Sequence, residues 1–320
     1  MPFTTGSFES FMKEAQTKIL KELRNQSKGA VHKKFVDVRT TDTHQNKDQD
    51  MESMGMLNHW PENTPRPEMA FYEGWPQVYS QTQFGGLVDI TKAMIKFGRY
   101  DLIRKLTQHL VRSSAKTKDI IFAAYLEYGD VAMASVPAYN GVPLVNTKGG
   151  DSLTLFNTAH KWRSTDQHTW GNLMSSHADL TRESIISMNK LVRRWTDNTG
   201  SPLDLKLRGV VVPSELVDQA LEVFKSKNQP ENANNAVNTA PLVMEAQEIV
   251  EYQWLQSQTA WYGLTNADIE DGLHAFYGWD NEVETGDANK NPRTGNRCIS
   301  IDFSVSHGAN LLRRMVKMPA

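Results

Sequence analysis

The sequence is poor in cysteine, and this scarcity limits the covalent chemistry open to it. Cys298 is the single cysteine among 320 residues. No disulfide can form within the chain, and zinc sites built from pairs of cysteines are excluded. Because Cys298 has no histidine beside it in the sequence, an inert thiol is a better interpretation than a nucleophile. A reducing compartment such as the bacterial cytoplasm fits this usage.

A strong charge of one sign and long apolar runs are also missing. The formal net charge is −2, with 35 Lys and Arg against 37 Asp and Glu. A protein whose main task is to grip nucleic acid normally carries a basic excess. No stretch approaches the ~18 uninterrupted apolar residues of a membrane-spanning helix. The first residues lack the basic-then-apolar order of a signal peptide. We therefore expect no membrane partner.

The common catalytic and phosphate-binding motifs are absent. The chain has no phosphate loop, dinucleotide-binding glycine pattern, nucleophile elbow or zincin helix. His160, Asp166, His168 and His177 are the one group to weigh as metal ligands, but the histidines are eight and nine residues apart. Those spacings are not the short-spaced pairs of a zinc site, so hydrogen-bonded loop histidines are preferred. We expect no catalytic site, no cofactor and no metal.

The N-terminal segment predicts an amphipathic helix. Its apolar residues recur three and four positions apart and share one face: Phe8, Phe11, Met12, Ala15, Ile19 and Leu23. Residues 13–34 hold seven Lys or Arg against two Glu. Two interpretations stand at even weight. One is a solvated helix packed on its own domain. The other is an arm that docks on a neighbour through Phe8 and Phe11, or faces nucleic acid through Lys13 and Lys21.

Residues 35–85 show no helical period and predict a long extended loop. The segment contains three prolines, Pro61, Pro65 and Pro67, and Gly85 with Gly86 closes it. Loops of this length are uncommon in compact domains unless they are functional or disordered, and disordered segments rarely carry many aromatics. An arm that orders by lying across another subunit satisfies both facts. The candidate inter-subunit contacts are Phe71, Tyr72, Trp75 and Tyr79.

The segment from Val88 to about Tyr128 predicts one long helix, with room for a kink. Its expected core stripe is Phe97, Ile103, Leu106 and Leu110. Residues 92–118 carry eight Lys or Arg and only Asp101 as an acid. Arg104 and Arg112 are therefore candidate genome-facing residues. A solvated face, or contact with acidic neighbours, is the preferred alternative on sequence alone.

Helices and strands alternate in the remainder, which predicts an α+β fold with a mixed or antiparallel sheet. We expect a helix opened by Thr181, a turn at 197–202, and a helix capped by Ser214. Expected strands cover residues 209–212, 248–255, 260–264 and 298–306. Residues 266–287 hold seven acids and no Lys or Arg. This patch could set register against the basic N-terminal third of another copy, with independent solvated faces at even weight.

One stretch also resembles a known family. Residues 151–160 read D-S-L-T-L-F-N-T-A-H, similar to the D-G-x-x-L-F-x-x-x-H element of the Mu-like major head subunit family, with Ser152 in place of glycine. The later elements follow in the family's order: Gly171-Asn172-Leu173, Gly200-Ser201-Pro202-Leu203, Val211-Val212-Pro213, Glu248-Ile249-Val250 and Ala260-Trp261-Tyr262. The resemblance covers roughly residues 86–320 and is strongest over 150–265.

This resemblance implies the Hong Kong 97-type capsid fold of tailed phages. It implies an N-terminal arm (1–34), an extended loop (35–85), a peripheral domain with a spine helix (86–135 and 295–320), and an axial domain (136–294). Homo-pentamers and homo-hexamers would tile an icosahedral shell around double-stranded DNA, which the shell would contact non-specifically. Portal, scaffold and decoration proteins would be further partners, and the acidic segment 266–287 would lie near the capsomer centre.

Three competing interpretations remain. An encapsulin-type cage would share the fold and enclose an enzyme in place of DNA. A cytoplasmic enzyme with an unrecognised site would purify as a monomer. A DNA-binding module using the basic helix over residues 92–118 would show strongly salt-dependent affinity, although the near-zero net charge argues against it.

Overall fold

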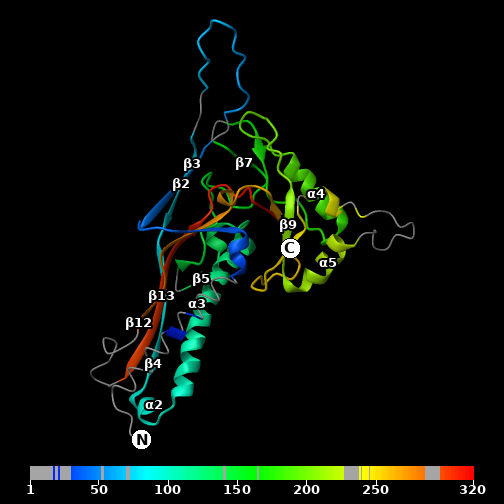
Figure 1. The fold of residues 1–320 in the computed structure, drawn as a ribbon. Helices are drawn as coiled ribbons and strands as arrows, with labels where there is room; N and C mark the ends of the chain where they lie inside the picture. The colour runs from blue at the N-terminus through cyan, green and yellow to red at the C-terminus, as the bar shows by residue number, and fades with distance from the viewer. Residues whose placement is uncertain are drawn as a thin grey trace.

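The protein is an elongated molecule with two four-stranded β-sheets, a long helix and a projecting hairpin (Figure 1). The computed structural model describes residues 17–18, 21, 30–51, 54–69, 73–139, 142–163, 166–226, 238, 240–244, 246–284 and 296–320. The predicted N-terminal helix lies outside these residues, except that Thr17, Lys18 and Lys21 are helical.

The first sheet is long, mixed and four-stranded, in the order β1-β12-β13-β4. Its strands are β1 (Val36–Thr40), β12 (Leu273–Glu284), β13 (Arg297–Gly308) and β4 (Thr82–Ile90). β1 runs parallel to β12, and the other two pairings are antiparallel. The expected alternation is confirmed on β13, because Ile299, Ile301, Phe303 and Val305 are all buried. Four strands with one covered face can hold a long, narrow domain together.

A single helix of 29 residues, α3 (Tyr100–Tyr128), runs along this sheet. The residues that it buries recur at helical spacing in its first half: Ile103, Thr107, Val111, Ser114 and Lys118. From Ile121 to Leu126 every residue is buried, because the helix there enters the core between the two sheets. The predicted long helix is therefore confirmed over residues 100–128.

The start of that prediction was wrong. Val88 lies in strand β4, and a separate short helix, α2 (Lys92–Lys96), follows it. Gly98 then adopts φ +64, which ends α2 and reorients the chain before α3 begins. Phe97 consequently sits at the end of α2 and is 77% exposed, so it is not a core residue of the spine helix. Of the other predicted core residues, Ile103 is buried, and Leu106 and Leu110 are half-buried.

The second sheet has the order β10-β9-β11-β14. Its strands are β10 (Glu248–Glu251), β9 (Leu207–Val212), β11 (Trp261–Thr265) and β14 (Met315–Met318). On one face, Val210, Val212 and Trp261 pack against the helices α4 (Arg182–Arg193), α5 (Val217–Lys225) and α6 (Ala240–Val243). On the other face, Val211 and Tyr262 join the core of the first sheet and α3. The two sheets therefore share one continuous core.

Local signals in this region are confirmed with two exceptions, Ser214 and the strand expected over residues 248–255, which ends at Glu251. Thr181 caps α4, because its hydroxyl accepts a hydrogen bond from Ser184 N–H at 3.3 Å. The turn after α4 contains Gly200 at φ +84. Ser214 does not cap α5: it begins a 3₁₀ turn, η3 (Ser214–Leu216), and its hydroxyl donates to Glu251 at 2.6 Å. The remaining short elements are η1 (Val31–Lys34), η2 (Met133–Ser135), η4 (Ile269–Asp271), β5 (Ala138–Tyr139), β6 (Val142–Pro143), β7 (His160–Lys161) and β8 (Thr169–Trp170).

Residues 35–85 are extended, as predicted, but as paired strands. β2 (Gln45–Met51) and β3 (Glu73–Ser80) form an antiparallel hairpin, and the segment between them projects beyond the body (Figure 1). Gly85 and Gly86 lie inside β4 and do not close the segment.

The strand pairing also crosses the predicted domain limits. β12 pairs with β13 along α3, so residues 273–284 of the acidic segment belong to the sheet of the spine helix. The strand β14, which was grouped with the peripheral domain, lies in the second sheet. The expected limit at 294/295 separates two strands that pair with each other, since sequence order alone does not reveal which strands are neighbours.

A half-buried histidine on β13 predicts a specific pH dependence of stability. The Tyr125 hydroxyl is 2.7 Å from His307 Nδ1, and burial lowers the pKa of His307 to about 4. Below pH ~6.5, His307 becomes protonated in the unfolded chain but stays neutral in the folded chain. The lowered pKa therefore contributes about 3 kcal/mol to the free energy of unfolding above pH 6.5. This stabilisation is lost as the pH falls towards 4.

The substitution His307→Asn tests this, because it keeps an acceptor near Tyr125 and removes the titration. We expect urea unfolding of unassembled subunits between pH 4.5 and 7 to show a shallower pH dependence for the variant than for the wild type. Equal slopes would contradict the assignment.

Candidate assembly surfaces

The tip of the β2–β3 hairpin exposes a group of large apolar side chains. Met56 and Leu57 are 85% and 84% exposed, and Met54 and Trp60 are each 52% exposed. Local contacts order the tip: Trp60 Nε1 donates to Thr64 O at 2.7 Å, and Arg66 lies over the Trp60 ring at 5.1 Å. Scattered apolar residues are normal on a surface, but a cluster on a projecting segment indicates a protein contact.

The root of the hairpin, in contrast, packs on the chain's own body. Tyr79 is 3% exposed and stacks on Phe276 with ring centroids 6.2 Å apart. The prediction that Tyr79 contacts another subunit was therefore wrong, because its neighbours on β12 already cover it. Trp75 is half-buried, and its Nε1 donates to Lys161 O at 2.9 Å. Both aromatics anchor the hairpin instead of extending its outer surface.

Several predicted residues fall outside the described part of the chain. They are Phe8, Phe11, Lys13, Phe71 and Tyr72. Lys21 is described, and it is exposed on a helical turn. The exposed Met54, Met56, Leu57 and Trp60 were missed as candidates. In the sequence, these four residues were distinguished only as apolar side chains inside a Pro-rich segment, without the spacing of a helix or a strand.

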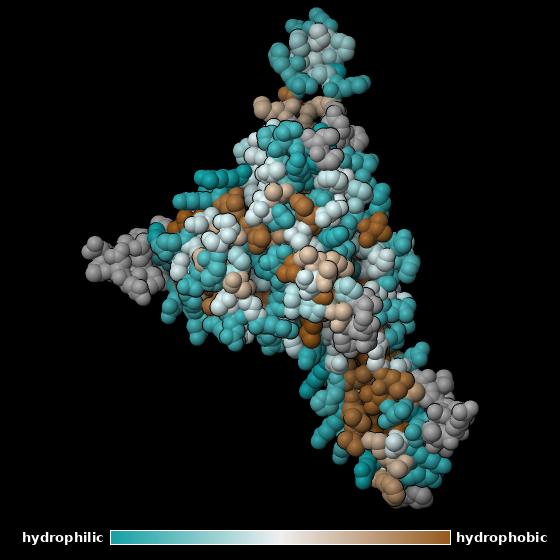
Figure 2. All heavy atoms as spheres, turned by 180° about the vertical axis from the view of Figure 1, so that it is seen from behind, coloured by the Kyte–Doolittle hydropathy of each residue, from teal (hydrophilic) through white to brown (hydrophobic). Residues whose placement is uncertain are grey.

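Three further exposed apolar side chains lie near the start of α3. Leu87 on β4, Phe97 after α2 and Leu102 on α3 are 59%, 77% and 42% exposed. Figure 2 shows hydrophobic side chains gathered over the narrow lower part of the molecule, the end at which Figure 1 places α2. The hairpin tip and these side chains lie at opposite ends, so one molecule cannot bring them together.

The outer face of α3 is basic, as predicted. Arg104 and Arg112 are both exposed. Arg104 lies 3.7 Å from Asp101, one helical turn before it. Lys118, at the other end of the basic stretch, points inward and pairs with Asp280 on β12. The helix therefore exposes a basic face over its first half only.

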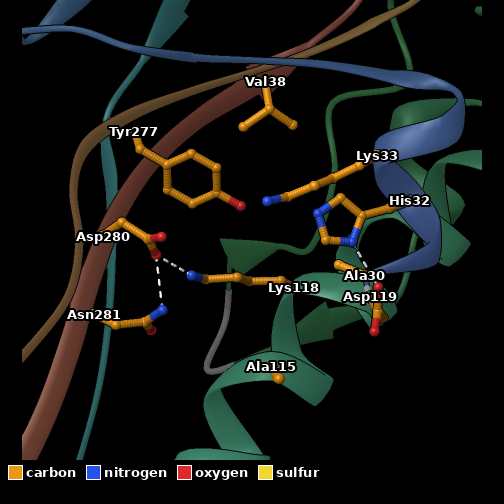
Figure 3. Close-up of a pocket in the computed structure, with 10 residues that line it drawn as sticks. All are labelled: Ala30, His32, Lys33, Val38, Ala115, Lys118, Asp119, Tyr277, Asp280 and Asn281. Atoms are coloured by element: carbon orange, nitrogen blue, oxygen red, sulfur yellow. Dashed lines mark hydrogen bonds and ion pairs between the residues drawn. The ribbon is translucent and has the colours of Figure 1, made fainter. Parts of the chain in front are cut away.

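The pocket between η1, α3 and β12 is a structural junction (Figure 3). His32 Nδ1 lies 2.6 Å from Asp119 Oδ1, and Lys118 bonds Asp280 across the pocket. The Lys118 ammonium also lies 4.9 Å from the centre of the Tyr277 ring. Burial lowers the pKa of Lys118, although Asp280 acts in the opposite direction. The two ion pairs tie η1 and β12 to the spine helix.

The histidines considered as metal ligands have separate structural partners. His160 is buried, with Nδ1 2.7 Å from Asp151 and Nε2 3.2 Å from Asn172. His177 Nδ1 lies 2.8 Å from Pro319 O. Among the described residues, no three His, Cys, Asp or Glu side chains come together as a metal site would require. Over the same residues, no helix has the length and apolar character to span a bilayer.

The chain matches the family model described as phage capsid protein over residues 75–310, which is most of its length. No curated protein matches it. Its fold is similar to those of solved structures from phages, although the sequence identities are low.

The capsid of Myoviridae phage XM1 is 10% identical with a TM-score of 0.52, and the match covers 88% of each chain. The bacteriophage JBD30 capsid is 15% identical with a TM-score of 0.52, over 70% of this chain and 90% of the other. The structure from Microbacterium phage Oxtober96 is 7% identical with a TM-score of 0.51, over 89% of each chain.

These similarities confirm the predicted α+β, Hong Kong 97-type capsid fold, with α3 as the spine helix. The chain belongs to the phage capsid protein family, so the protein is a structural subunit of a phage capsid.

Proposed function

We propose that this capsid protein is a Mu-like major head subunit whose pentamers and hexamers close an icosahedral shell around double-stranded DNA. The observation that carries the proposal is the free apolar tip of the hairpin, with Met56 and Leu57 more than four-fifths exposed. A monomer would gain nothing from such a tip. A shell subunit buries it on a neighbour, and many identical contacts of modest strength become effectively permanent on closure.

The placement of the exposed apolar residues supports association of the head-to-tail kind. Because the tip and the exposed apolar residues near α2 lie at opposite ends, a contact between the tip of one copy and that end of another copy is heterologous. Heterologous contacts close into rings when the rotation between subunits allows it. Pentamers and hexamers are such rings.

Within this proposal, the sheet of α3 is the peripheral domain and the second sheet is the axial domain. The exposed basic residues of α3, Arg104 and Arg112 among them, are proposed to face the packaged DNA. Portal, scaffold and decoration proteins are proposed as further partners, as in tailed-phage heads generally. The Mu-like assignment rests on the order of motifs over residues 150–265.

Cryo-electron microscopy of particles from cells expressing the full chain tests the proposal. We expect closed icosahedral particles with twelve pentameric vertices. In particles that have packaged DNA, density for the nucleic acid should lie against the basic face of α3. Recovery only as a monomer of 36.2 kDa would overturn the proposal. Particles enclosing a protein cargo without DNA would indicate the encapsulin-type cage instead.

A further inference from the structure

The inner face of strand β2 is polar where it crosses the body of the molecule. Asn46, Asp48 and Asp50 alternate with outward residues and face the first sheet and the loop after it. Asn46 donates to Ser306 on β13 at 2.8 Å. Lys47, between them, is exposed and faces away. Since strand residues two apart share a face, these three side chains form one row of contacts.

Asp48 begins a chain of close polar contacts that reaches η4. Its carboxylate lies 3.3 Å from His274 Nε2 on β12. His274 Nδ1 lies 3.4 Å from Asp37 on β1, and Asp37 is 2.7 Å from Arg39 Nε. Arg39 then pairs with Glu270. The Tyr79 hydroxyl, from β3, also donates to Asp48 at 3.3 Å. Three elements, β2, β3 and β12, thus meet at Asp48.

Asp50 begins a second, shorter chain. Its Oδ1 accepts a hydrogen bond from Arg313 Nη2 at 3.0 Å, and the same guanidinium bonds Asp271. Arg313 is held in place from its other side, because its guanidinium carbon lies 4.6 Å from the centre of the Trp162 ring. The arginine side chain is only 11% exposed, so this pair is better shielded from water than most surface pairs.

Directional contacts of this kind fix an angle better than apolar packing does. Removing one partner of a part-buried charged pair leaves the other charge uncompensated. Charged hydrogen bonds also depend on direction, so the arrangement has one preferred geometry. The two chains together hold five carboxylates, Asp37, Asp48, Asp50, Glu270 and Asp271, against two guanidinium groups, those of Arg39 and Arg313. Burial raises the pKa of Asp50, with Asp271 and Asp48 adding to the effect and Arg313 opposing it. The acid excess makes these contacts dependent on the two arginines.

We propose that Asp48, Asp50, His274 and Arg313, here called the hairpin clamp, are positioning residues that set the angle at which the β2–β3 hairpin leaves the body. The proposal rests on the proposed shell function, because the angle decides where the tip meets its neighbour. Met56 and Leu57 lie six and seven residues after Asp50 in the sequence, which is at most about 20 Å of chain. A rotation of about 10° at the clamp therefore moves the tip by up to about 3 Å, which is enough to disturb a packed site.

The double variant Asp48→Asn, Asp50→Asn tests the clamp, because it removes both charges and keeps the side-chain shapes. Lys47→Gln is the matched control, as it removes a charge from the same strand on the outward face. We expect amide hydrogen exchange in residues 45–51 and 73–80 to rise at least tenfold in the double variant. We also expect its particles to be aberrant in size or open, as seen by cryo-electron microscopy. The control should match the wild type in both measurements.

Two further measurements separate positioning from simple loss of folding. The double variant should retain the wild-type near-ultraviolet circular dichroism and exchange protection in α4 and β9, far from the clamp. Arg313→Lys, which keeps the positive charge, should fall between wild type and Arg313→Gln in particle uniformity. Wild-type hairpin protection and uniform wild-type shells in the double variant would overturn the clamp. Loss of protection throughout the chain would also overturn it, by showing a general role in stability. Absence of shells from the wild-type chain would instead refute the proposed function.

Discussion

A chain in which Met56, Leu57 and Trp60 are replaced by serine is expected to fold normally and to form no closed shell. These side chains are 85%, 84% and 52% exposed, so their removal costs the body of the isolated subunit almost nothing, although it also removes the contacts of Trp60 with Thr64 and Arg66 within the tip. Burying each of them on a neighbour would contribute ~1.5–3 kcal/mol. Because every subunit repeats the contact, the loss is multiplied over the particle. Size-exclusion chromatography with light scattering would detect the shift from particles to free subunits or capsomers.

The control for this variant uses the polar residues of the same tip. Glu62→Gln and Glu68→Gln change exposed side chains without removing apolar area, and particles should form as in the wild type. The thermal midpoint of unassembled subunits should stay within about 2 °C of wild type in all these variants. Normal particles from the triple serine variant would show that the tip is not an essential contact.

The substitution Gly209→Ala is expected to destabilise the subunit by about 3 kcal/mol, which is large for one added methyl group. Gly209 lies in β9, which pairs with β10 on one side and β11 on the other. A Cβ atom at this position would lie 2.2 Å from the carbonyl oxygen of Glu248 and 2.8 Å from its Cβ. The backbone of a paired strand cannot move aside without breaking the ladder. A urea unfolding curve of unassembled subunits would show the loss as a lower midpoint.

Gly278→Ala provides the matched comparison for that substitution. A Cβ at Gly278 would meet only the end of the Gln81 side chain, at 3.5 Å, which is ordinary contact with a group that can move. We expect its unfolding midpoint to stay close to that of the wild type. Equal effects of the two glycine substitutions would contradict the close approach between β9 and β10.

Sequence patterns predicted much of the secondary structure, because helix caps and the alternation of apolar side chains depend on residues that are close together in the chain. Alternation along residues 299–305 predicted β13, and the Thr181 cap predicted the start of α4. The absence of a period over residues 35–85 correctly indicated extended backbone. The break at Gly98 was missed, since a single glycine inside a helical pattern is often tolerated. That one residue is why Phe97 is exposed and not part of the core stripe.

The assembly surfaces were harder to predict, because they depend on which segments become neighbours. Tyr79 and Met56 belong to the same aromatic and apolar loop in the sequence, yet one is buried and the other is 85% exposed. The difference arises from the hairpin pairing and from the approach of β12, neither of which leaves a local signal. The clamp residues likewise come from positions 48, 50, 274 and 313, which only the fold brings together.

The pairing of β1 with β12 has a consequence for how the subunit is made. Val36 lies beside Leu273, and β4 is completed only by β13. The ribosome therefore releases β1, the hairpin and the spine helix long before their partners exist. Contacts between such distant parts of a chain form slowly and late. Until they form, the apolar stripe of α3 and the open strand edges are exposed to other nascent chains. Such a subunit is expected to need chaperone protection during synthesis, and it becomes competent to assemble only after its long sheet has closed.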